Sequence, residues 1–374
     1  MPESPFTGNE IRFGFIAHPR SLSELKRLVW RHGLPIIPFG TEDFLKSQCL
    51  KKKAVKPIYT FPTLVSHQNI PCRGRVYCIF LMPDQILSLQ STAMKLVEVA
   101  CQQAQEWGCR VIGLGGLTGA IGSRGKEIAE KITVPVTSGN CLTVYSTLAT
   151  FARLQKEIDL DFSSEKIVIV GFPGSISLAI ARILARRGFN LVLVSRRKTP
   201  FLDRFVSELK GSCTGGIEIT EDLSRSLTRG RIIVTATSTG QIIDPDILLS
   251  GSIVLDIAQP RDVIEKRKKR KDVLILDGGV VTVPKSTSNR VKFSNWEAND
   301  VPACLAETII LALEGASESF SLGRELPLDK IEEIGCKSEA HGFIANTLRS
   351  FRRPVDGANL QFTREAFKKG RQVA

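Results

Sequence analysis

The sequence predicts an α/β protein in which a Rossmann-like, doubly wound parallel sheet follows an N-terminal α/β domain and precedes a helical C-terminal region. Two observations lead to this prediction. Short apolar, β-branched runs alternate with helical patterns as far as about residue 290, after which helical patterns alone remain. A glycine-containing turn, GFPGSIS at 171–177, follows one of these runs and opens a helix. The 374 residues are also enough for two or three domains.

Residues 1–155 are predicted to form the first α/β domain, and the charged stretch 156–166 to link it to the next. Its expected elements are, in order, a strand at 11–18, a helix at 21–33, a strand at 76–83, a helix near 91–107 and a strand at 109–116.

Residues 156–290 are predicted to form the Rossmann-like domain. A strand at 167–171, a helix at 177–188 and a strand at 190–197 make a βαβ unit of the usual length. Three more apolar strands follow, at 231–238, 252–258 and 273–281. In the third region, 291–374, a helix from Cys304 and a shorter one near 327–340 precede a basic tail.

The turn at 171–177 predicts a dinucleotide site. Gly171 permits the tight turn, and Gly174 lets the backbone approach a pyrophosphate. Ser175 and Ile176 open the helix, whose N-terminus favours the negative charge of the phosphates. Ser177 stands at the third glycine position, where a small residue still permits close helix packing.

The end of the second strand indicates which cofactor binds. It carries Ser195, Arg196 and Arg197, where folds that prefer NAD usually place an acidic residue. A hydroxyl and two guanidinium groups suit a 2′-phosphate, so NADPH is predicted rather than NADH. Four residues after later strands are predicted to line the nicotinamide half, although turn formation explains the glycines equally well: Thr235, Ala236, Gly278 and Gly279.

Cys304 is the candidate nucleophile. It follows Pro302 at the start of a predicted helix that Asn299 or Asp300 can cap. The positive end of the helix dipole would favour a thiolate there. With nine cysteines in the chain, a buried structural cysteine is the alternative.

Composition limits the classes of function. No apolar run is long enough to span a bilayer and no signal-peptide pattern is present, so a cytoplasmic protein is expected, with reduced thiols and no metal site. The net charge of +13 suits an anionic partner. Because the basic run at 265–272 has no interleaved aromatics, we interpret it as a solvated loop, and a nucleic acid is not the expected partner.

The whole set of motifs resembles the long-chain acyl-[acyl-carrier-protein] reductases of cyanobacteria over nearly the whole length to about Phe343. The resemblance rests on the following segments: FGFIAH with Ser21 and Leu22, FLMPDQIL, LGG at 114–116, TSGN at 137–140, GFPGSIS, LDGGVV, DVPACLAET and FSLGRELPLDKIEEIGCKSEAHGF. The order and spacing of these segments are far more specific than the glycine turn alone.

The resemblance implies NADPH-dependent reduction of a long-chain acyl thioester to a fatty aldehyde, with Cys304 as the nucleophile. It also implies an N-terminal acyl domain and, as partner, an acyl carrier protein or acyl-CoA. An aldehyde-consuming enzyme and peripheral membrane contact are further candidates. His341 matches the ending of the family pattern, and either proton transfer or packing of the last helix is open to it.

Three alternatives remain. A reductase similar to glutamyl-tRNA reductase would use Cys141, and LDIAQPRD at 255–262 looks like part of that family. A sensor that binds NADPH without turnover would not need a reactive Cys304. Shikimate-dehydrogenase-like chemistry is the weakest reading, because no convincing Lys/Asp pair is found.

Overall fold

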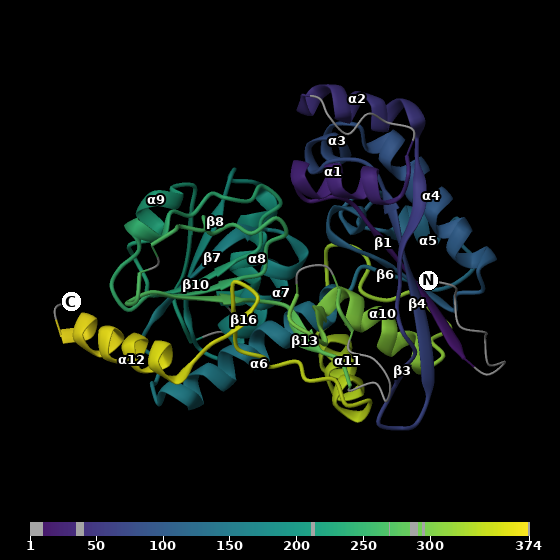
Figure 1. The fold of residues 1–374 in the computed structure, drawn as a ribbon. Helices are drawn as coiled ribbons and strands as arrows, with labels where there is room; N and C mark the ends of the chain where they lie inside the picture. Colours follow the sequence, from purple (N-terminus) through teal and green to yellow (C-terminus); the bar gives the residue numbers. More distant parts are fainter. Residues whose placement is uncertain are drawn as a thin grey trace. The chain divides into compact units, whose positions relative to one another are not determined.

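The computed structural model describes residues 10–34, 41–210, 214–268, 270–284, 291–293 and 296–372. It divides the chain into two units (Figure 1). The first comprises Met1–Leu142, Thr282–Gly323 and Glu333–Ile344, and the second comprises Thr143–Val281, Arg324–Glu332 and Ala345–Ala374. The C-terminal region is thus shared between the units, and Cys304 belongs with the N-terminal residues.

The first unit is built on a mainly parallel sheet, as the predicted fold class requires. Its strand order is β2-β4-β1-β5-β6, with β3 paired to β4; β2 and β3 are antiparallel to β4, and the other pairs are parallel. The strands are β1 (Ile11–Ala17), β2 (Val55–Thr60), β3 (Leu64–Val65), β4 (Pro71–Ile79), β5 (Val111–Leu114) and β6 (Val136–Thr137).

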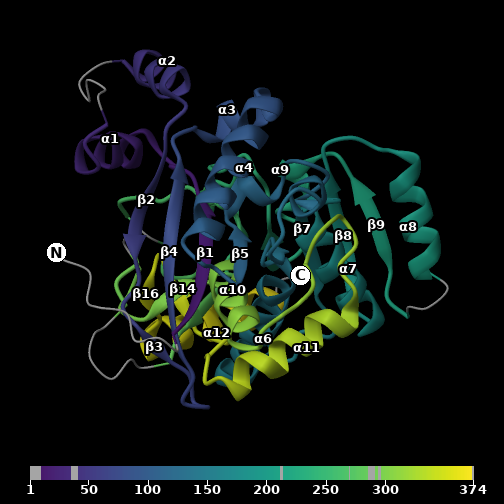
Figure 2. The ribbon, with the colours of Figure 1, turned by 90° about the vertical axis from the view of Figure 1, so that its right-hand side faces the viewer.

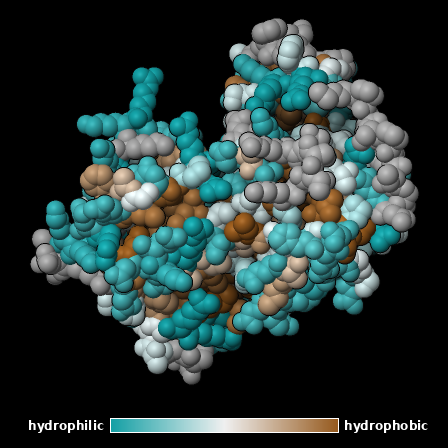
Figure 3. Space-filling model, turned by 60° about the horizontal axis from the view of Figure 1, so that its bottom comes forward, coloured by the Kyte–Doolittle hydropathy of each residue, from teal (hydrophilic) through white to brown (hydrophobic). Residues whose placement is uncertain are grey.

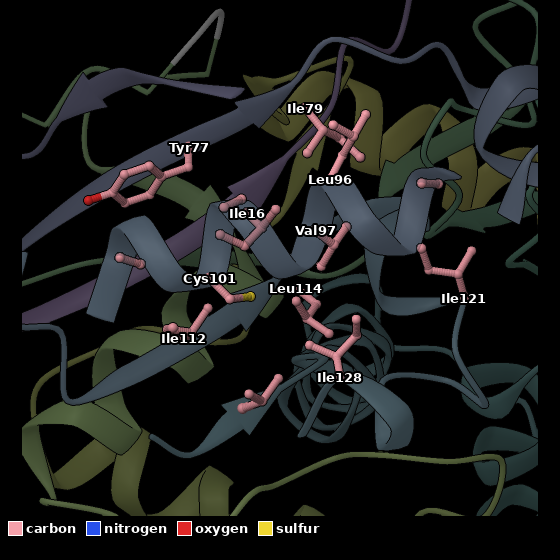
Figure 4. Close-up of a cluster of buried hydrophobic side chains, with 14 of the residues drawn as sticks. Ile16, Tyr77, Ile79, Leu96, Val97, Cys101, Ile112, Leu114, Ile121 and Ile128 are labelled. Atoms are coloured by element: carbon pink, nitrogen blue, oxygen red, sulfur yellow. The ribbon is translucent and has the colours of Figure 1, made fainter. Parts of the chain in front are cut away.

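Helices cover both faces of this sheet, as buried parallel strands require. On one face, α4 (Gln90–Glu106) packs Leu96 and Val97 into a hydrophobic cluster with Ile16 and Ile112 (Figure 4). On the other face lies α10 (Ala303–Leu313). Gly113 of β5 makes room for it, since a Cβ there would lie 2.0 Å from the Thr308 hydroxyl.

Shorter elements complete the first unit: α1 (Leu22–Arg31), α2 (Glu42–Lys52), α3 (Pro83–Ser88), η1 (Gly116–Gly119), α5 (Lys126–Ala129) and β14 (Asp300–Pro302). Three elements cross the boundary between units: α6 (Asn140–Ile158), β13 (Val280–Thr282) and α11 (Leu328–Ala340). Ser21 caps α1 by accepting the N–H of Glu24, while the Glu24 carboxylate accepts the N–H of Arg20.

The second unit has the predicted Rossmann-like sheet. All neighbouring strands are parallel, and their order is β12-β11-β10-β7-β8-β9. The order reverses beside β7, and in such sheets the ligand site lies at the carboxyl ends of the strands at that point. The strands are β7 (Lys166–Phe172), β8 (Asn190–Ser195), β9 (Ile217–Thr220), β10 (Ile232–Thr235), β11 (Ile253–Asp256) and β12 (Leu274–Asp277).

Helices flank this second sheet. In Figure 2, α8 (Pro200–Lys210) lies beside the edge strand β9, and α7 (Ser175–Arg186) joins β7 to β8. The remaining elements are α9 (Leu223–Ser226), η2 (Pro245–Ile247), β15 (Arg349–Ser350), β16 (Arg353–Pro354) and α12 (Gly357–Gln372).

The basic tail forms the helix α12, which packs onto the second unit. Phe367 is fully buried, and its ring centroid lies 5.4 Å from that of Phe162. Gly251 allows close contact, because a Cβ there would lie 2.6 Å from the backbone of Phe367. The tail is therefore part of the fold of this unit.

The surface is mainly polar on the face shown in Figure 3, where hydrophilic residues surround smaller hydrophobic patches. Within the described part of the chain, no helix is both long enough and apolar enough to cross a membrane.

Candidate active site

The turn after β7 has the form of a phosphate-binding turn. Gly171 has a φ of +92°, and a Cβ at this position would lie 2.6 Å from the carbonyl oxygen of Ala236, so no other residue fits easily. Gly174 precedes α7, which Ser175 and Ile176 begin. The Ser177 hydroxyl donates to the carbonyl oxygens of Gly171 and Gly174, at 3.0 Å each. A serine at the third glycine position thus closes the turn and leaves its outer side to a ligand.

The end of β8 presents two exposed arginines at the same edge of the sheet. The Arg196 guanidinium donates to the Thr239 hydroxyl, which lies beyond β10. Ser195 is buried, and its hydroxyl donates to the carbonyl oxygen of Arg197 at 3.0 Å. Both arginines are thus exposed at the end of β8, while the Ser195 proton is already used within the turn.

The other four predicted cofactor residues also lie at the carboxyl edge. Thr235 is buried, and its hydroxyl donates to Asp262 at 2.5 Å. The N–H of Ala236 donates to Val170, and that of Gly278 donates to Asp256. Gly279 has a φ of +67°. Thr235 therefore supports the edge of the sheet through Asp262, and the backbone N–H groups of Ala236 and Gly278 are used within the fold.

Sequence reasoning missed a cluster of acidic residues at this edge. Asp256 ends β11 and Asp277 ends β12 at the paired position. Burial raises the pKa of Asp256 to about 7, although it accepts three backbone N–H groups, including that of Val263 at 2.9 Å. Asp277 forms an ion pair with Arg261 at 2.6 Å. The repeated Leu-Asp at the ends of both strands was the signal that could have identified these residues.

Cys304 lies at the start of α10, as predicted, and is partly exposed. The cap differs from the prediction: Pro302 occupies the N-cap position, while Asp300 accepts the Thr282 hydroxyl and Asn299 accepts the N–H of Val291. The backbone N–H groups of Leu305, Cys304 and Gly116 lie close enough to the Cys304 sulfur to lower the pKa of its thiol, against the larger effect of burial. Donors from two separate segments therefore meet at one thiol.

A second glycine turn lies against Cys304. Gly139 follows β6 with a φ of +74°, and a Cβ there would lie 2.1 Å from the Cys304 Cα. Glu307, one helical turn after Cys304, anchors this turn: its buried carboxylate accepts the Leu142 N–H at 2.7 Å and the Thr137 hydroxyl. The TSGN segment and α10 thus form one connected site.

The thiol is not ionised in the free protein. Burial, followed by the negative charge of Glu307, raises the pKa of Cys304 to about 12, and the three N–H donors only partly oppose this. The prediction that the helix dipole yields a thiolate is therefore wrong for the free protein. Low local dielectric outweighs the dipole here.

Cys141, the alternative nucleophile, lies in the same unit near the start of α6. It is fully buried, and its backbone N–H donates to the Ser321 hydroxyl at 3.1 Å. Among the described cysteines, Cys336 is exposed, Cys304 is partly exposed and all the others are buried. Cys304 is the one that combines access with converging donors.

His341 lies at the other end of α10. Its Nε2 is 2.6 Å from a carboxylate oxygen of Glu314, the residue that follows the helix. Ten residues of helix separate Glu314 from Cys304, about 15 Å at the rise of an α-helix. This position suits the packing role rather than proton transfer at Cys304. No group of three metal-ligating side chains is found in the described ranges.

The match to a family model agrees with the fold of the second unit. The family model described as Shikimate / quinate 5-dehydrogenase matches residues 153–277. All of these residues belong to the segment Thr143–Val281 of the second unit. A solved structure of NAD-dependent malic enzyme from Thermotoga maritima covers 97% of this chain and 85% of its own, with 13% identity and a TM-score of 0.44.

Two curated relatives match most of the chain. Aminotransferase PigE from Serratia sp. (strain ATCC 39006) is 36% identical over 355 residues, 92% of this chain, and the chain spans 41% of that protein's length. A long-chain acyl-[acyl-carrier-protein] reductase from Synechococcus elongatus is 26% identical over 348 residues, 88% of this chain and 98% of that protein. Together with the strand order of the second unit, the family match supports a Rossmann-like fold for residues 153–277.

Proposed function

We propose that the protein is an NADPH-dependent reductase that converts a long-chain acyl thioester into a fatty aldehyde through an acyl-enzyme on Cys304. The observation that carries this proposal is the Cys304 site, where a partly exposed cysteine at a helix start lies near the N–H groups of α10 and of Gly116. The similarity to the Synechococcus reductase, which spans 98% of that protein, supports it.

The first step is a thiol–thioester exchange. The Cys304 sulfur forms a bond to the acyl carbon, and the bond from that carbon to the carrier sulfur breaks. The proton of Cys304 leaves with the departing thiol, so the exchange is balanced without an added acid or base. The N–H groups of Gly116 and Leu305 stabilise the negative charge that passes through the Cys304 sulfur.

The second step releases the aldehyde. NADPH, when bound, supplies the hydride that reduces the acyl thioester to a hemithioacetal. Cleavage of the carbon–sulfur bond then yields the aldehyde and the Cys304 thiolate, whose charge the same N–H groups stabilise. The thiolate takes up one proton from solvent, which replaces the proton that left with the carrier thiol in the first step. The residues that would hold the cofactor are those of the 171–177 turn with Arg196 and Arg197. The turn fits a pyrophosphate because Gly174 directly precedes the N-terminus of α7, whose backbone N–H groups favour phosphate.

The carrier is proposed from charge. A net charge of +13 favours an acidic acyl carrier protein, and an acyl-CoA, whose phosphates are also anionic, is the second candidate donor. The same positive charge also suits contact with an anionic membrane surface. The aldehyde needs a consuming enzyme, and a transamination is one reaction that uses an aldehyde; the relative named aminotransferase is consistent with that.

Intact-mass measurement tests the proposal. Wild type, Cys304→Ala and Cys141→Ala would each be incubated with a long-chain acyl-CoA and with an acylated carrier protein, first without NADPH. We expect one acyl adduct on wild type and Cys141→Ala, none on Cys304→Ala, and release of aldehyde when NADPH is added. An adduct lost only in Cys141→Ala would favour the reductase resembling glutamyl-tRNA reductase. If no variant acylates but NADPH binds, the protein is a cofactor-binding sensor.

A further inference from the structure

His18 is held in a fixed state between two backbone groups. It follows β1, is 7% exposed, and its Nδ1 lies 2.9 Å from the carbonyl oxygen of Pro19. Its Nε2 accepts the N–H of Leu117 at 3.1 Å. One ring nitrogen must donate and the other must accept, so the ring is neutral, with its proton on Nδ1.

The surroundings keep the ring neutral. Burial lowers the pKa of His18 to about 4; the nearby charges are Arg20, which lowers it further, and Glu24, which opposes this. His18 therefore has no role as a general base at neutral pH, because neither nitrogen is available to a substrate proton.

The residue beside Leu117 is Gly116, whose N–H lies close enough to the Cys304 sulfur to lower the pKa of that thiol. Gly116 has a φ of +58°, and a Cβ there would lie 2.8 Å from Nε2 of His18. The His18 ring thus contacts two consecutive residues of the turn. It accepts a hydrogen bond from Leu117 and packs against Gly116. A shift of the ring would move the Gly116 donor.

We propose that His18 is a positioning residue for Cys304, which fixes η1 so that the Gly116 N–H remains directed at the sulfur. This inference rests on the proposed function. The sulfur carries negative charge twice in that reaction, when it attacks the thioester and when it leaves the hemithioacetal. Both steps need a donor that is already in place, because reorienting a backbone turn during the reaction would add to the barrier.

Three variants separate this role from simple packing. His18→Gln places an amide oxygen near the position of Nε2, where it can still accept the Leu117 N–H. His18→Asn reaches only the position of Nδ1 and retains the Pro19 contact alone. His18→Leu has a similar bulk and no acceptor.

The first measurement is the rate at which iodoacetamide alkylates Cys304 as a function of pH, followed by peptide mass. This readout needs no acyl substrate, so it tests His18 even if wild type fails to acylate and the proposed function is wrong. We expect His18→Leu and His18→Asn to be alkylated more slowly than wild type at every pH from 7 to 10, and His18→Gln to stay near the wild-type rate.

The second measurement is the single-turnover acylation rate. Loss of one hydrogen bond to a charged sulfur predicts about a tenfold decrease for His18→Leu and His18→Asn, with His18→Gln within about threefold of wild type. NADPH binding, which uses the other unit, serves as the folding control. If His18→Leu does not fold, the alkylation and acylation rates of His18→Gln and His18→Asn still test the proposal. Equal losses in all three variants, or wild-type alkylation profiles in His18→Asn, would overturn the proposal.

Discussion

Burial of Cys304, together with the Glu307 carboxylate three residues further along α10, raises the pKa of its thiol to about 12. The same carboxylate holds the TSGN turn against the helix through Leu142 and Thr137. Glu307 therefore connects the TSGN turn to α10 and adds to the effect of burial on the pKa of the Cys304 thiol.

Alkylation of wild-type Cys304 should reveal this protonated state. Because only the thiolate reacts and its pKa is about 12, the rate should rise about tenfold per pH unit from pH 7 to 10, without a plateau. Glu307→Gln keeps a hydrogen-bonding side chain but removes the charge, so its rate at pH 8 should exceed that of wild type. A wild-type rate that levels off near pH 7 would contradict the neutral-thiol state.

The parallel sheet of the second unit could be predicted from sequence because its strands are continuous apolar runs, and the GFPGSIS turn has a local signature. The short strands β2 and β3 could not be predicted, because their extended conformation depends on pairing with β4. The site of Cys304 was predicted, but not its ionisation. The protonation state of the thiol depends first on burial and then on the charge of Glu307, and sequence spacing reveals neither.

Gly139 should tolerate no side chain. Gly139→Ala adds a Cβ 2.1 Å from the Cys304 Cα at a φ of +74°, so we expect a loss of about 3 kcal/mol or more in the free energy of unfolding, and slower acylation. Gly315→Ala is the matched control: it follows the same helix with a φ of +63°, but its Cβ meets no atom within 4 Å. There the cost should be about 1 kcal/mol, from backbone strain alone. Equal losses in urea unfolding would refute the contact.

Arg196 and Arg197 should determine the preference for NADPH. Replacing either with alanine removes charge-assisted hydrogen bonds to a 2′-phosphate, which predicts an increase in KM for NADPH of about 10- to 100-fold and little change in KM for NADH. Arg204→Ala, an exposed arginine on α8 of the same unit, is the control. Steady-state kinetics with both cofactors would measure the effect. A parallel change for NADH would show that the arginines do not read the 2′-phosphate.

His18 should also make stability depend on pH. The ordinary pKa of 6.5 in the unfolded chain falls to about 4 in the folded protein, so between these values the unfolded chain binds more protons and acid favours unfolding. The contribution of His18 is fully present above about pH 6.5 and is lost as the pH falls to about 4, by up to about 3 kcal/mol.

Asp256 and Glu307 act in the opposite direction, because their raised pKa values make the folded protein bind protons more readily. The measurement is therefore the difference in unfolding free energy between wild type and His18→Gln, in which those carboxylates cancel. This difference should shift in favour of the variant from pH 7 to 4.5; a constant difference would mean that His18 is protonated equally in both states and does not hold the neutral form that its position beside Leu117 requires.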